Sequence, residues 1–125
     1  LSVTAESLAN LGLLLASGGL HPVTRERVLT ERTVRIVKTI MLTCGMYDGS
    51  GEFAVRVGMP SKSGVGGGII SVVDGYAGLG IYGPSLDEKG NSIAGIAMLE
   101  YISRQMDFHM FGNRNKKVLE ENKIC

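Results

Sequence analysis

The stretch Lys62-Ser63-Gly64-Val65-Gly66-Gly67-Gly68, followed directly by Ile69-Ile70-Ser71-Val72-Val73, decides how this chain folds. The apolar run is typical of a buried β-strand, and the glycines before it let backbone N–H groups approach a ligand closely. Asp74-Gly75 is a two-residue hairpin signal of type I′, which predicts a return strand from Tyr76 to Tyr82. From Pro60 onward the sequence therefore predicts β-structure, with an antiparallel hairpin at its centre.

Three helices are predicted around this hairpin from capping residues and apolar periodicity. The first covers Ala5 to about Ser17 behind the cap Thr4, and the second follows the cap Thr30 and ends at Gly45. The third covers about 92 to 106 with Asn91 as its cap, while 46–59 is predicted as a loop with a short irregular helix or strand. The residues predicted to face inward are Leu8, Leu11 and Leu15; Val34, Val37, Met41 and Cys44; and Ile93, Ile96, Leu99, Ile102 and Met106.

The hairpin alone cannot complete a sheet. Its strands carry apolar residues on both faces, which is typical of a sheet covered by helices on both sides, and two isolated strands are marginal in water. We therefore expect further strands from a missing segment or from a partner chain.

Composition excludes several classes of protein. Thirteen Lys and Arg residues against twelve Asp and Glu give a net charge of +1, whereas a nucleic-acid-binding protein usually carries a clustered basic face. No apolar run reaches the roughly 18 residues of a membrane span. The two cysteines, Cys44 and Cys125, form no CxxC pair, which favours a reducing, cytoplasmic location. His21 and His109 stand alone, so we expect no metal site and no cofactor.

Gly78-x-Gly80-x-x-Gly83 matches the dinucleotide-binding fingerprint letter for letter. That fingerprint must follow a strand and open a helix, whereas these glycines fall inside the predicted return strand and precede Pro84. We interpret them as small residues where a helix packs tightly on the sheet.

Lys62-Ser63-Gly64 is the strand-edge triplet found in serine acyl-transfer enzymes that also carry a Ser-x-x-Lys nucleophile. No serine of this chain has a lysine three residues later. The triplet is therefore either a surface lysine entering a strand or one side of a divided catalytic site. In the second case the glycines would let an amide such as that of Val65 donate to an oxyanion, an interaction of about 3–4 kcal/mol.

Tyr47 lies just past a predicted helix end, in a loop that contains several glycines. Its hydroxyl could bind a substrate or relay a proton, or it could simply be a loop tyrosine whose tip is solvated. Cys44 is disfavoured as a nucleophile because it is predicted on an apolar helix face.

Four separated stretches carry a family resemblance. They are Leu15-Ala-Ser-Gly-Gly-Leu-His-Pro-Val-Thr-Arg-Glu-Arg-Val-Leu29, Cys44-Gly-Met-Tyr-Asp-Gly-Ser-Gly-Glu-Phe53, Gly58-Met-Pro-Ser-Lys-Ser-Gly-Val-Gly-Gly-Gly68 and Leu86-Asp-Glu-Lys-Gly-Asn-Ser92. In this order and at these distances they resemble the glutaminase family. The resemblance implies an α/β (α+β) fold of the serine β-lactamase type, an antiparallel sheet flanked by helices. It implies a domain of about twice this length, of which residues 1–111 are the C-terminal half and 112–125 a tail.

The resemblance also implies hydrolysis of L-glutamine to L-glutamate and ammonia through a glutamyl-serine intermediate. The nucleophilic serine and its lysine belong to the N-terminal half of the family's domain. Tyr47 matches a tyrosine that contacts substrate and belongs to the proton network, and Val65 matches the residue whose amide meets the substrate carbonyl. Lys62, Ser63 and Gly64 match the supporting strand edge. The expected partners are L-glutamine, the N-terminal half and further copies, in a homodimer or homotetramer.

Two other interpretations stay open. One is a truncated, non-catalytic assembly or binding module that pairs with a full-length partner. The other is a different serine acyl-transferase of the same fold, such as a β-lactamase or transpeptidase relative, which the loop around Tyr47 disfavours. Because the chain lacks Ser-x-x-Lys, we expect it to be inactive alone.

Overall fold

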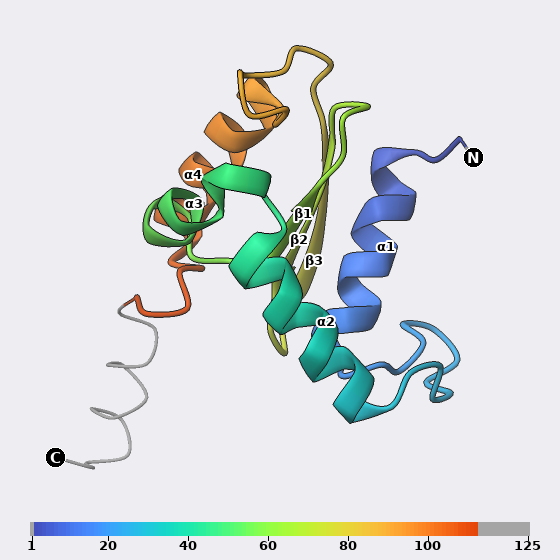
Figure 1. Cartoon of the computed structure of the whole chain (residues 1–125). Helices are drawn as coiled ribbons and strands as arrows, with labels where there is room; N and C mark the ends of the chain where they lie inside the picture. Colours follow the sequence, from blue (N-terminus) through green and yellow to red (C-terminus); the bar gives the residue numbers. More distant parts are fainter. Residues whose placement is uncertain (1, 113–125) are drawn as a thin grey trace, which may run out of the picture.

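A computed structural model of the chain describes residues 2–112, so the predicted tail lies outside them except for Gly112. Four α-helices, one 3₁₀ helix and three strands follow one another in these residues (Figure 1). They are α1 (Ala5–Ala16), α2 (Glu31–Cys44), η1 (Tyr47–Gly49), α3 (Ser50–Arg56), β1 (Ser61–Ser63), β2 (Gly68–Val73), β3 (Ala77–Tyr82) and α4 (Ile93–Met106). Segment 46–59 is thus a 3₁₀ turn and a short helix, and the strand considered for it is wrong.

The three strands form one antiparallel sheet in the order β1-β2-β3. Ser61 pairs with Ser71 across β1 and β2, and Ile69 pairs with Ile81 across β2 and β3. The predicted hairpin and the β-structure after Pro60 are confirmed. Lys62 and Ser63 of the Lys-Ser-Gly triplet therefore lie on the outer strand β1, and Gly64 directly follows it.

The hairpin turn differs from the predicted type I′. Val73 pairs with Ala77, which leaves three residues in the connection, and the Tyr76 amide donates to Val73 O at 2.9 Å. A type I′ turn needs positive φ at both central residues, but here only Gly75 has it, at 70°. The Gly75 amide donates to Ala16 O at 2.9 Å, so docking on the end of α1 fixes the turn.

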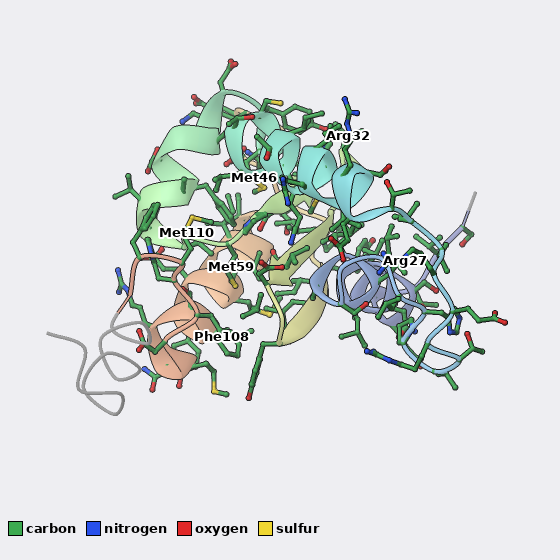
Figure 2. The ribbon with its side chains drawn as sticks, turned by 90° about the horizontal axis from the view of Figure 1, so that it is seen from below. Arg27, Arg32, Met46, Met59, Phe108 and Met110 are labelled. Atoms are coloured by element: carbon green, nitrogen blue, oxygen red, sulfur yellow. The ribbon has the colours of Figure 1, made fainter. Side chains whose placement is uncertain are left out.

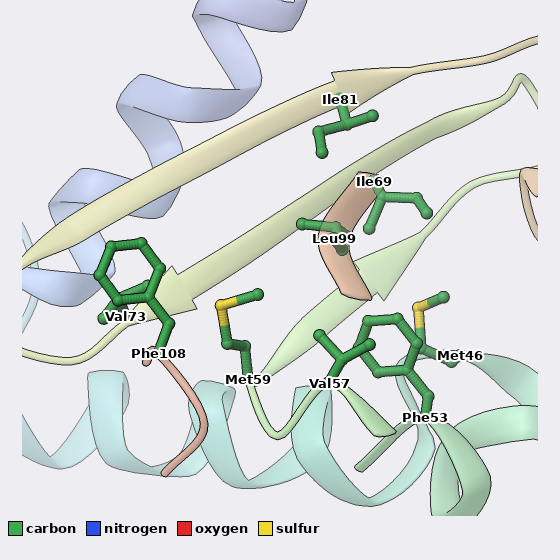
Figure 3. Close-up of a cluster of buried hydrophobic side chains, with 9 residues drawn as sticks. All are labelled: Met46, Phe53, Val57, Met59, Ile69, Val73, Ile81, Leu99 and Phe108. Carbon is green, nitrogen blue, oxygen red and sulfur yellow. The ribbon is translucent and has the colours of Figure 1, made fainter. Parts of the chain in front are cut away.

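Helices cover both faces of the sheet, as the apolar pattern of β2 predicts (Figure 1). Val72 faces α1 and α2, where it joins a cluster with Leu15 and Met41. Ile69 and Val73 point the other way. Their cluster includes Phe53 of α3, Leu99 of α4 and the remaining members drawn in Figure 3: Met46, Val57, Met59, Ile81 and Phe108.

The glycines of β3 allow α1 to lie almost in contact with the strand. A Cβ atom added to Gly78 would lie 2.0 Å from Leu13 N, and one added to Gly80 would lie 2.0 Å from Ala5 O. No real Cβ contact is that short, so a side chain at either position would push α1 off the sheet. The interpretation of this repeat as a tight helix–sheet contact is confirmed.

The connection between α1 and α2 is tied down by one arginine. Arg27 Nη1 donates to Gly18 O and to Leu29 O, each at 3.0 Å. Figure 2 shows Arg27 beside α1, on the other side of the molecule from Phe108 and Met110.

Two of the three predicted helix caps are confirmed. Thr4 Oγ1 accepts from Ser7 N and Thr30 Oγ1 from Thr33 N, each at 3.1 Å. The third cap is Ser92, whose Oγ accepts from Gly95 N at 3.0 Å. Asn91 is therefore wrongly predicted as a cap, because its side chain turns inward to another segment.

Several residues predicted to face inward are exposed. Leu11 is exposed because its neighbour Gly12 occupies the closest approach of α1 to the sheet. Cys44 is exposed at the last residue of α2, with its Sγ against Ile40 O. On α4 the buried stripe runs along Gly95, Leu99 and Ser103, which leaves Ile93 and Met106 outside it at the two ends.

The cap of α2 gives a simple test of this local structure. Thr30→Ala removes the side-chain acceptor of the Thr33 amide, so we expect the free energy of unfolding to fall by about 1 kcal/mol. Thr43→Ala on the same helix removes bonds from an exposed hydroxyl to groups of its own helix, chiefly Thr39 O, and we expect a change within about 0.5 kcal/mol. Denaturant unfolding measures both variants, and equal losses would contradict the capping role.

Candidate active site

Tyr47 opens η1, two residues beyond the end of α2 and its cap, and adopts a backbone conformation that is uncommon for its type. Its φ is 52°, in the left-handed region, where a bulky residue is rare. Its side chain is 40% exposed. The ring is thus held at the surface by a constrained backbone, which is the kind of conformation that clusters at functional sites.

Lys62 approaches Tyr47 from the sheet. Its Nζ lies 4.7 Å from the centroid of the Tyr47 ring, within the range of a cation–π contact. The same ammonium group donates to Ser63 O. Lys62 therefore links the triplet on β1 to the Tyr47 ring.

Val65 lies in the turn between β1 and β2, close to the same ring. The turn is closed by bonds from Gly64 N to Gly68 O and from Gly67 N to Gly64 O, each 2.9 Å. Val65 is 72% exposed, and its amide has no hydrogen-bond acceptor in the part of the chain that the structure describes. An unpaired amide at a surface turn is available to a ligand.

Gly90 completes the arrangement and was not predicted as a site residue. A Cβ atom placed on it would lie 3.8 Å from the Tyr47 ring and 3.9 Å from Val65 Cγ1. Its φ is 90°, which favours glycine. Three segments distant in sequence thus meet at one place. The only sequence signal for Gly90 was its position inside the stretch Leu86–Ser92 that carries the family resemblance.

Ser63 stands one step behind this surface. Its side chain is buried, and its Oγ has no hydrogen-bond partner within residues 2–112. A buried hydroxyl without a partner is costly. Of the residues predicted on β1 and its turn, Lys62 and Val65 are thus the two that the structure brings near Tyr47.

A chain of ion pairs links α3, α4 and the segment that carries Gly90. Arg56 on α3 contacts Glu100 on α4 and Glu52 at 3.2 Å, and Glu52 contacts Lys89 at 3.5 Å. The hydrogen bond between Arg56 and Glu100 lowers the pKa of Glu100 below its ordinary value and raises the pKa of Arg56. The segment carrying Gly90 is therefore tied to α3, although such exposed pairs contribute little stability.

A cavity of about 790 Å³ lies elsewhere. It is at the hairpin-turn end of the sheet, between α2 and residues 108–110, and Tyr47, Lys62 and Val65 do not line it. In residues 2–112, no three His, Cys, Asp or Glu side chains gather as a metal site. Nor does any helix in that range have the length and apolarity to cross a membrane.

Comparisons with known proteins agree on one family. The glutaminase family model matches residues 1–111. The glutaminase of Fusobacterium nucleatum is 58% identical over 108 residues, which are 86% of this chain and 35% of the relative. That of Clostridium botulinum is 52% identical over 111 residues, 89% of this chain and 36% of the relative.

Solved structures give the same result. The Bacillus subtilis glutaminase YbgJ, in a covalent complex with 5-oxo-L-norleucine formed by reaction with 6-diazo-5-oxo-L-norleucine, superposes with a TM-score of 0.85 at 42% identity. The match covers 87% of this chain and 40% of that one. The chain thus spans about a third of the length of the curated relatives it matches.

Proposed function

The chain belongs to the glutaminase family, and on this premise we propose that it is the C-terminal part of an enzyme that hydrolyses L-glutamine to L-glutamate and ammonia. The observation that carries the proposal is the meeting of Tyr47, Lys62 and Val65 at one place. They come from two segments distant in sequence, η1 and β1 with its turn, and the contacts of Lys62 and Gly90 bring them around one ring. Their exposed groups are a hydroxyl and an unpaired amide, as acyl transfer requires.

In the proposed reaction a serine attacks the side-chain amide of glutamine, and the carbonyl oxygen becomes an oxyanion. The Val65 amide donates to that oxygen, an interaction of about 3–4 kcal/mol in the transition state. The Tyr47 hydroxyl contacts the substrate and takes part in moving the proton between nucleophile and leaving ammonia. Water then releases glutamate from the glutamyl-serine.

Lys62, Ser63 and Gly64 have a supporting role in this proposal. The ammonium group over the Tyr47 ring restricts how the ring can turn, an effect of about 0.5–1 kcal/mol at an exposed position. Gly64 closes the turn that presents Val65 through its bond to Gly68 O.

We propose that the preceding part of the same domain supplies the nucleophile and completes the sheet. The outer edge of β3 pairs with no strand within residues 2–112. The exposed face of α4 carries Ile93, Met98 and Tyr101. An open strand edge beside an apolar helix face is a surface that proteins ordinarily cover. In this proposal residues 1–111 are the C-terminal part of one domain, which assembles as a homodimer or homotetramer in the cytoplasm.

Activity measurements test whether the nucleophile lies outside this chain. The complete enzyme, in which the preceding polypeptide is present, should release ammonia from L-glutamine, whereas the chain alone should release none because it holds no Ser-x-x-Lys nucleophile. Release by the chain alone would show that the nucleophile lies within these residues. If the chain binds the preceding polypeptide but the assembled protein never releases ammonia, the chain is the non-catalytic assembly module instead.

A further inference from the structure

The backbone of Tyr47 needs support that its own sequence neighbourhood does not supply. A left-handed φ of 52° brings the Cβ atom of a bulky residue close to its own carbonyl oxygen. Such a conformation persists only where the surrounding structure fixes it. The groups that fix it therefore decide where the Tyr47 ring and hydroxyl point.

Ser50 holds the backbone around Tyr47 through two hydrogen bonds. Its Oγ accepts from the Met46 amide at 3.0 Å and donates to Tyr47 O at 2.7 Å. Only 5% of the residue is exposed, so water does not compete for these bonds. One hydroxyl thus ties together the backbone on both sides of Tyr47.

Asn91 holds the same segment from another part of the chain. Its Nδ2 donates to Met46 O at 3.0 Å, across 45 residues of sequence, and only 1% of the residue is exposed. The carbonyl of Met46 belongs to the peptide group that precedes Tyr47. Asn91 and Ser50 therefore fix the two peptide groups whose orientation defines the Tyr47 backbone.

Asn91 is itself held by a closed turn. Asp87 Oδ1 accepts from Lys89 N and from Asn91 N, each at 2.9 Å, and Asp87 N donates to Asn91 O at 2.8 Å. These bonds use the backbone of Asn91 and leave its side chain to Met46. The same turn places Gly90 against the Tyr47 ring.

We propose that Ser50 and Asn91 are positioning residues of the glutaminase reaction. They hold Tyr47 in its left-handed conformation, so that its hydroxyl faces the substrate beside the Val65 amide. The inference rests on the proposed function of Tyr47. It predicts that these two buried residues act on turnover through Tyr47 and not only on the stability of the fold.

Asn91→Asp in the complete enzyme tests this directly. The variant keeps the shape of the side chain but replaces the donor with a carboxylate oxygen facing Met46 O. We expect kcat for L-glutamine to fall about tenfold or more, since misplacement by about 1 Å can cost 10²-fold, while KM changes much less. In a Tyr47→Phe background the same substitution should cause no further fall in kcat.

Ser103→Ala is the matched control. Ser103 Oγ is buried and donates to Val57 O at 2.6 Å, so it bonds a carbonyl at the far end of the same 46–57 segment. The variant should lower the thermal unfolding midpoint, as we also expect for Asn91→Asp, and leave kcat unchanged. If Asn91→Asp does not fold, Ser50→Ala carries the same test, because it removes both bonds of the Ser50 hydroxyl.

The outcomes separate the two proposals. An unchanged kcat in Asn91→Asp, or a loss that adds in full to that of Tyr47→Phe, overturns the positioning role while the proposed role of Tyr47 stands. A fall in kcat for Ser103→Ala equal to that for Asn91→Asp also overturns it, because stability alone would then explain the effect. A wild-type rate in Tyr47→Phe removes Tyr47 from the reaction, and the positioning role with it.

Discussion

Tyr47→Phe in the complete enzyme is expected to lower kcat for L-glutamine by about 10²-fold or more. The substitution removes only the hydroxyl, and general acid–base contributions of a positioned side chain are typically 10²- to 10⁴-fold. The ring keeps its contact with Lys62 and its place against Gly90, so the fold should be unaffected. Initial rates of ammonia release measure the effect, with thermal unfolding as the check on folding.

Tyr76→Phe is the control for this loss. Tyr76 is an exposed residue of the turn between β2 and β3, and the same hydroxyl is removed there outside the site. We expect wild-type turnover for it. Equal rates for Tyr47→Phe and the wild-type enzyme would remove Tyr47 from the mechanism and leave the Val65 amide as the remaining candidate in this chain.

Gly78→Ala is expected to cost about 3 kcal/mol or more of the free energy of unfolding. The added methyl would lie 2.0 Å from Leu13 N and 2.3 Å from Ala9 O, and both atoms belong to the backbone of α1. Backbone atoms cannot turn aside as a side chain can, so α1 must move as a whole or β3 must distort. Overpacking of a core typically costs 1–3 kcal/mol, and backbone clashes belong to the upper end.

Gly51→Ala provides the comparison. Gly51 lies in α3, and nothing lies within 4 Å of an added Cβ atom there. Alanine in an exposed helix position should stabilise the protein by up to about 1 kcal/mol. Denaturant unfolding measures both glycine variants. A loss of less than about 1 kcal/mol for Gly78→Ala would mean that α1 can retreat from the sheet at little cost.

The elements that could be predicted from the sequence are those with local causes. Thr4 and Thr30 cap their helices through a neighbour three residues away, and the hairpin of β2 and β3 follows from a contiguous apolar run. Asn91 could not be predicted in the same way. A polar residue before a helix resembles a cap, and the bond that gives it another role joins it to Met46 in a distant segment.

The candidate site likewise contains residues that the sequence predicts and one that it does not. Tyr47 and Val65 were predicted from a family resemblance, and the structure places them together, while their chemical roles remain predictions. Gly90 was missed because its contribution is the absence of a side chain next to residues far away in sequence. Cys44 was predicted as buried because the helical period of α2 reaches it, but it lies at the last residue of the helix, where no residue of 2–112 covers it.

Two consecutive residues of the turn Asp87–Asn91 act on Tyr47. Gly90 lies next to its ring, and Asn91 bonds the Met46 carbonyl of the peptide group that precedes Tyr47. The length of the turn is therefore constrained, in addition to the identities of Asp87, Gly90 and Asn91. Inserting or deleting one residue would shift both contacts at once, whereas Glu88 and Lys89 are exposed between the fixed points. Within the family, this turn should keep its residue count and vary mainly at the exposed position 88.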